Sequence, residues 1–72
     1  MTITEAANIL KAMHSSALPG EQVVQIHLFG IKYAKELDGL SATKIAEQAG
    51  IGSSFGTEIS KGKKLARYVR IV

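Results

Sequence analysis

A glycine-marked break between two helix-forming stretches is the feature that most constrains how this chain can fold. Before the break, Ser41 stands where a side chain can cap free backbone N–H groups, and Ile45 and Ala49 lie one turn apart on one face. Gly50 then suits the left-handed residue that ends a helix, because it has no Cβ to clash. The sequence therefore predicts a short helix over residues 42–49 that stops in a tight turn.

A second helix is predicted directly after the turn, over residues 54–61. Ser54 can cap its start, and Ile59 falls on its inward face. Gly56 lies in this stretch and Gly62 directly follows it, and an interior glycine costs a helix about 1 kcal/mol relative to alanine. We therefore expect the second helix to be short or bent.

Residues 41–67 resemble the helix-turn-helix family of DNA-binding domains. Ala46 stands where that family places a small residue under the helix crossing, Gly50 follows four residues later, and apolar Ile51 comes next. The resemblance implies that the second helix lies in the major groove and that the partner is double-stranded DNA. It also implies a transcriptional regulator, or the DNA-binding part of a phage or bacterial DNA-acting system.

The charge of the chain is concentrated at one end. Residues 1–58 contain four basic and six acidic residues, a balance of −2, whereas residues 59–72 contain five basic residues and no acid, a balance of +5. A nucleic-acid binder needs such a basic segment, because neutralising phosphates supplies most of the non-specific affinity. Taken alone, the same segment could also be a solvated face that only confers solubility.

Hydroxyl and basic side chains at and after the start of the second helix are the candidate DNA contacts. Hydroxyls and free helix N–H groups suit phosphate oxygens or base edges, although the serines could equally act as helix caps. No Arg, Asn or Gln precedes Arg67 in the second helix, so sequence preference would come from few contacts or from another domain or subunit. The candidate DNA-binding residues are Ser53, Ser54, Thr57, Lys61, Lys63, Lys64 and Arg67.

Two further helices are predicted before this region. Thr2 and Glu5 have the spacing of a capping box, which opens a helix over residues 3–14 with an inward apolar stripe that includes Met13. Pro19 then breaks the pattern, because it lacks a backbone donor and restricts the residue before it.

Residues 21–37 form the most apolar stretch, and apolar side chains cover most of a helix's circumference there. This pattern predicts a central, buried helix. A strand over residues 23–29 is the rival interpretation, but helix-forming sequence continues through Lys35 without a turn signal. Gly30 could allow another helix to approach closely.

The sequence thus predicts an all-α fold, a single domain over residues 1–72 with four helices. The strand-preferring tail, which includes Tyr68 and Val72, could pack as an extended arm or pair with another subunit. Beyond DNA, a homodimer or a larger protein is a further possible partner. The alternative to DNA binding is a helical adaptor domain whose basic tail docks on an acidic protein.

Catalytic and metal chemistry are not expected. The chain has no cysteine, and His14 and His27 have no acidic residue at a spacing that would complete a metal site with both. The glycines of residues 50–56 do not have the spacing of a phosphate-binding loop. We therefore expect neither an enzyme nor a cofactor.

The predicted location is the cytoplasm. The first ten residues carry no basic region leading into an apolar run, so no secretory signal is expected. The longest uncharged apolar stretch, residues 22–31, has about half the length of a membrane span.

Overall fold

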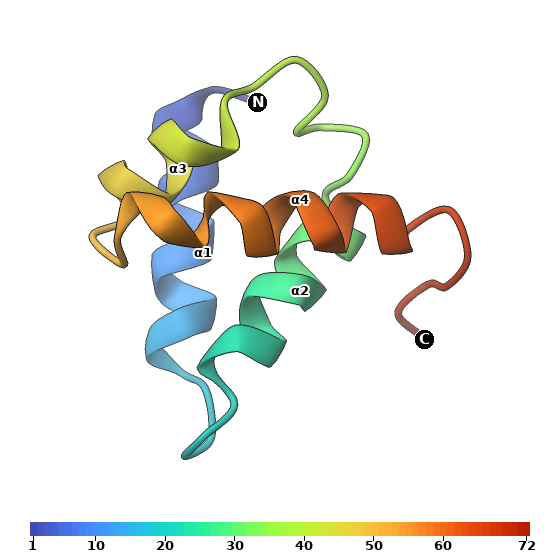
Figure 1. Cartoon of the computed structure of the whole chain (residues 1–72), viewed down its shortest axis with the longest axis horizontal. Helices are drawn as coiled ribbons and strands as arrows, with labels where there is room; N and C mark the ends of the chain where they lie inside the picture. Colours follow the sequence, from blue (N-terminus) through green and yellow to red (C-terminus); the bar gives the residue numbers. More distant parts are fainter.

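The computed structural model describes residues 1–72 as four α-helices and no β-strand, which confirms the all-α prediction. Helix α4 crosses α2 and packs against α3 near its beginning, while α1 packs against α2 and α3. In Figure 1 the C-terminal tail leaves from the other end of α4. The helices are α1 (Ile3–Ser15), α2 (Gln22–Lys32), α3 (Ala42–Gln48) and α4 (Gly56–Leu65), with a 3-10 turn η1 (Ser53–Phe55) before α4.

Side-chain caps begin α1 and α3, as the sequence predicts. The Glu5 backbone N–H donates to Thr2 Oγ1 at 3.1 Å, and the Thr2 N–H donates to Glu5 Oε1 at 2.8 Å, which completes the capping box. The Lys44 backbone N–H donates to Ser41 Oγ at 3.2 Å. These caps satisfy donors that would otherwise lack a partner in the first turn.

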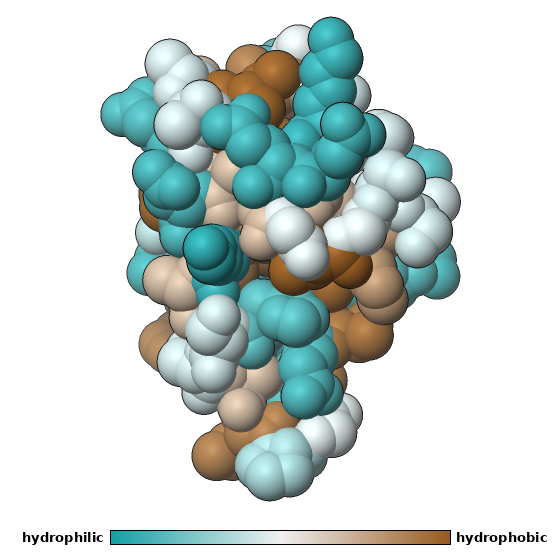
Figure 2. All heavy atoms as spheres, turned by 90° about the vertical axis from the view of Figure 1, so that its left-hand side faces the viewer, coloured by the Kyte–Doolittle hydropathy of each residue, from teal (hydrophilic) through white to brown (hydrophobic).

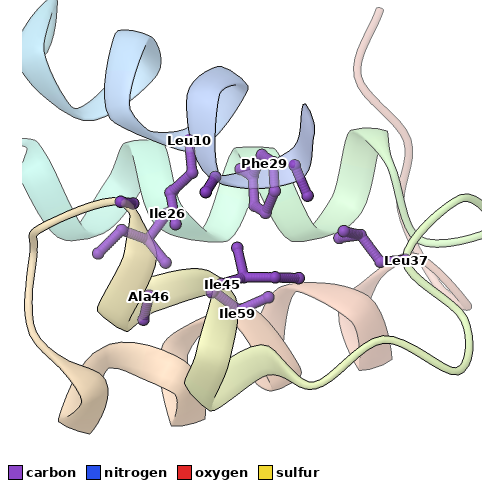
Figure 3. Close-up of a cluster of buried hydrophobic side chains, with 10 residues drawn as sticks. Leu10, Ile26, Phe29, Leu37, Ile45, Ala46 and Ile59 are labelled. Carbon is purple, nitrogen blue, oxygen red and sulfur yellow. The ribbon is translucent and has the colours of Figure 1, made fainter. Parts of the chain in front are cut away.

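The core is a single cluster to which every α-helix contributes. Phe29 and Ile26 of α2 are fully buried, and Figure 3 shows them pointing toward Ile59 of α4 and Leu10 of α1. Such a cluster supplies most of the free energy that holds a chain of this length together. The ten buried members are Ala6, Ala7, Leu10, Ile26, Phe29, Leu37, Ile45, Ala46, Ala49 and Ile59.

The helix predicted over residues 21–37 corresponds to α2, which is shorter and less buried than the sequence predicts. It is helical over residues 23–29, so the strand alternative is wrong, but it ends at Lys32 and not at residue 37. Turns follow, in which the Leu37 N–H donates to the Tyr33 carbonyl at 2.9 Å, and the Leu37 side chain is buried in the core. Val24 is 46% exposed, so α2 is not buried all round.

Glycines set the distances between α4 and its neighbours. A Cβ on Gly30 of α2 would lie 2.8 Å from the Gly62 Cα, and a Cβ on Gly56 would lie 2.9 Å from the Thr43 backbone N. Such distances are shorter than side chains tolerate, so only glycine permits these helix crossings. The expected close approach at Gly30 is confirmed. We expected Gly56 and Gly62 to shorten or bend the helix predicted over residues 54–61. Helix α4 instead begins at Gly56 and continues past Gly62 to Leu65.

The turn before α4 also differs in detail from the prediction. Gly50 has the left-handed backbone (φ +80°) that was expected at the end of α3. Ser54 does not cap α4, because it lies inside the 3-10 turn and Phe55 occupies the N-cap position without a side-chain hydrogen bond. The 3-10 turn starts the helix, so the two serine hydroxyls are not used as caps.

The C-terminal tail forms no strand. It turns back after α4, where the Val69 N–H donates to the Leu65 carbonyl at 3.0 Å, and Val69 and Ile71 then line a groove with Ile31 of α2. The residues from Arg67 to Val72 are all exposed, and in Figure 1 the tail curves away from the end of α4. None of the helices has both the length and the apolar character needed to cross a bilayer.

Candidate nucleic-acid interface

Helix α4 presents one face to the core and the opposite face to solvent. Its buried residues, Gly56, Ile59 and Gly62, recur every three residues and therefore share one face. Thr57, Lys61 and Lys64 recur at spacings of four and three on the other side, and all of their side chains are exposed. The structure therefore brings three of the sequence-predicted contact residues together on one outward surface.

A groove runs beside this surface, between α3 and α4. The close approach of Gly56 to Thr43 brings the two helices together, so hydroxyl groups from α3 and α4 line the same depression of about 320 Å³. Hydroxyls and lysine ammonium groups are donors that suit phosphate oxygens and base edges. This α3–α4 groove is lined by Ala42, Thr43, Gly56, Thr57, Ser60, Lys61 and Lys64.

The predicted hydroxyl contacts lie at the start of α4. Ser53 and Ser54 are exposed, and their side chains make no hydrogen bond within the chain. The Thr57 hydroxyl donates to the Ser54 carbonyl at 3.1 Å, so its direction is fixed while its oxygen can still accept. These three side chains are therefore available to a ligand at the start of α4, and Thr57 also lines the α3–α4 groove.

Lys63 does not lie on the same face. Lys63 is half-buried, and a Cβ added to Gly30 of α2 would lie 2.9 Å from the Lys63 backbone N. One residue corresponds to about 100° around a helix, which turns Lys63 away from Lys64 and toward α2. Among the candidate contacts on α4, Lys63 therefore does not share the outward surface of Thr57, Lys61 and Lys64.

Glu58 is a residue of this helix that sequence reasoning missed. Its carboxylate is 20% exposed and accepts from His27 Nε2 at 2.7 Å and from Lys61 Nζ at 3.1 Å. The hydrogen bond from His27, and then that from Lys61, hold the pKa of Glu58 below its usual value. The spacing of Glu58 and Lys61 signals their pair in sequence, whereas His27 is 31 residues away and only the fold brings it close.

Arg67 lies beyond the end of α4, in a second groove. This α2–tail groove has a volume of about 460 Å³ and collects basic side chains from α2 and from the tail. Its lining residues are Ile31, Lys32, Lys35, Glu36, Ala66, Arg67, Val69, Arg70 and Ile71. Sequence reasoning did not place Lys32 and Lys35 in a site, because they belong to the half of the chain with a net negative balance.

The side of the molecule beside α1 and α3 is of a different character. Figure 2 shows a mixed surface on this side, with hydrophilic side chains gathered mainly in its upper part and hydrophobic side chains exposed between and below them.

A short helix, a glycine turn and a second helix with a hydroxyl- and lysine-bearing outer face define a helical domain of the helix-turn-helix class. Comparison with known families agrees with this class. The family model described as an HTH-like domain matches residues 2–72, so the chain belongs to that family. No curated protein and no solved structure matches the chain significantly.

Proposed function

We propose that this protein is a non-enzymatic, cytoplasmic helix-turn-helix protein that binds double-stranded DNA through the outer face of α4. The observation that carries the proposal is the surface formed by Thr57, Lys61 and Lys64 beside the hydroxyl-lined α3–α4 groove. We propose that it acts as a transcriptional regulator or as the DNA-binding part of a phage or bacterial DNA-acting system.

The dimensions of α4 suit the major groove. With its side chains an α-helix is about 10–12 Å across, and the major groove is about 12 Å wide, so the ten residues of α4 can lie in it. The glycine contacts with α2 and α3 fix the helix to the core, so its outer face is presented without rearrangement. We propose that Lys64 reaches phosphate and that Thr57 lies near base edges.

The composition of this face supports low sequence discrimination by a single chain. Threonine and serine accept or donate single hydrogen bonds, whereas bidentate readout comes from Arg, Asn or Gln. Glu58 also holds Lys61 in an ion pair at 3.1 Å, which reduces the attraction of this lysine for phosphate. We propose that a second copy or a partner protein supplies further specificity.

The test is fluorescence anisotropy of a labelled random-sequence duplex over a potassium chloride series. Phosphate contacts predict that log affinity falls linearly with log salt, with a slope of about −0.9 for each phosphate neutralised. Lys11→Ala is the control, because Lys11 is exposed on α1 and lines neither groove, so its removal should change the salt slope least. Absence of binding at low salt would contradict the proposal and would favour the adaptor alternative.

A further inference from the structure

The α2–tail groove gathers four basic side chains that have no acidic partner within the chain. Lys32, Lys35, Arg67 and Arg70 line the groove, and Glu36 is the single acid among its lining residues. The salt bridges of the molecule involve other residues, namely Glu58 with His27 and Glu58 with Lys61. The groove therefore concentrates uncompensated positive charge.

Two of these cations also lie over aromatic rings, which stabilise them weakly. Lys32 Nζ lies 5.5 Å from the centre of the Tyr33 ring, and Arg67 Cζ lies 5.9 Å from the centre of the Tyr68 ring. At exposed sites such contacts contribute about 0.5–1 kcal/mol, and they remove no charge. Like charges held close together repel one another, so an external anion would stabilise this arrangement.

Basic side chains at the end of α4 and just after it lead from the α3–α4 groove to the α2–tail groove. Lys61 and Lys64 are three residues apart on α4, so they are neighbours on its surface. Arg67 follows in the turn directly after the helix, where its backbone N–H donates to the Lys64 carbonyl at 3.2 Å. Lys64 lines the first groove and Arg67 the second, and the row therefore joins the two.

We infer that the α2–tail groove binds the phosphodiester backbone of the same duplex, beside the contact made by the outer face of α4. This inference rests on the proposed DNA binding and extends its footprint to α2 and the tail. A continuous row of cations from one groove to the other matches a continuous polyanion better than it matches a compact acidic segment of a protein.

The residues of the groove have distinct roles in this contact. Arg67 and Arg70 carry planar guanidinium groups that hold phosphate oxygens in bidentate fashion. Lys32 is the last residue of α2, Lys35 lies in the turns that follow, and both side chains are exposed and supply point charges. Val69, Ile71 and Ile31 line the same groove, so the tail that carries Arg70 borders α2 there.

The experiment compares the double variant Lys32→Ala/Lys35→Ala with Lys11→Glu, using a labelled random-sequence duplex in anisotropy titrations over a potassium chloride series. Both variants lower the net charge by two, from +3 to +1, so a general charge effect is equal in the two. Lys11 is exposed on α1 and lines neither groove. We expect the double variant to lose about two units of salt slope, and Lys11→Glu to lose less than about one.

Three results would overturn the inference. If the double variant matches Lys11→Glu in slope and affinity while the parent binds DNA, the groove is outside the footprint and the proposed function stands. If the parent binds no DNA, the proposed function fails and the inference fails with it. If the double variant keeps the parent's slope but loses binding of a labelled polyglutamate peptide, the groove serves an acidic protein.

Folding is checked by thermal melting followed by circular dichroism. Should the alanine variant lose its fold, Lys32→Gln/Lys35→Gln retains the aliphatic stems and the same charge change. The slope of the glutamine variant then decides the question by the same criterion.

Discussion

Gly30 and Gly62 meet face to face where α2 crosses α4. A Cβ on Gly62 would lie 2.9 Å from the Gly30 Cα and 2.5 Å from the His27 carbonyl oxygen. Neither neighbour is a flexible side chain, so the backbone of one helix would have to move. This contact places Ile59 against the core and turns Lys61 and Lys64 outward.

The substitution Gly62→Ala tests this contact, because the contact and helix propensity predict opposite changes in the free energy of unfolding. Helix propensity alone predicts a gain in stability of about 1 kcal/mol, because alanine is the better helix former. The close approach predicts a loss of about 1–3 kcal/mol instead, since an added methyl group forces the helices apart. The measurement is urea denaturation at neutral pH, and a gain in the free energy of unfolding would contradict the crossing.

Ile45 is a core residue and Val24 is a surface residue, so truncating them should change stability by different amounts. Ile45 is 1% exposed, so Ile45→Ala should cost about 2–5 kcal/mol, a large share of the stability of so small a domain. Val24 is 46% exposed, so Val24→Ala should change stability by about 0.5 kcal/mol or less. Thermal melting of the two variants provides the comparison, and equal melting temperatures would show that the core is assigned wrongly. Leu28, which sequence periodicity places in the core, is half-buried outside the main cluster and should matter less than Ile45.

The pH dependence of stability should reveal the Glu58 cluster. The pKa of Glu58 is lowered from its usual 4.5 by hydrogen bonds from His27 and Lys61. A lowered folded-state pKa contributes stability that is present above pH 4.5 and is lost as the pH falls through the folded value. The free energy of unfolding of the parent should therefore exceed that of Glu58→Gln near neutral pH and converge with it in acid. A difference that does not vary between pH 3 and pH 7 would show that the carboxylate is not held in this way.

Lys64 and Lys63 are adjacent in sequence but differ in orientation, which makes them a matched pair for DNA binding. Lys64 is exposed beside the α3–α4 groove, so Lys64→Ala should weaken binding to all duplexes alike and reduce the salt slope by about one unit. Lys63 is half-buried on the side of α2, so Lys63→Ala should reduce the slope by less. Anisotropy titrations over a salt series measure both, and a larger effect at Lys63 would contradict the orientation of α4.

Local features were predictable from the sequence because their partners are near in the chain. The caps at Thr2 and Ser41 use a residue three positions away, and the left-handed Gly50 follows from the end of α3 alone. The roles of Gly56 and Gly62 were not predictable, because glycine propensity is a local quantity and their partners lie in other helices.

The candidate site follows the same division. The outward position of Thr57, Lys61 and Lys64 follows from helical spacing once the inward face is known. The pairing of Glu58 with His27 depends on how α2 crosses α4. The same crossing brings Lys32 and Arg70 to one groove. No spacing in the sequence encodes that crossing.

The central claim is that the outer face of α4 contacts duplex DNA, and amide chemical-shift mapping tests it most directly. The labelled protein is titrated with an unlabelled random-sequence duplex at low salt. The account predicts that the largest shifts fall at Thr43, Thr57, Lys61 and Lys64, while the amide of Lys11 on α1 stays unchanged. Shifts confined to α1, or no shifts at any concentration of DNA, would contradict the account.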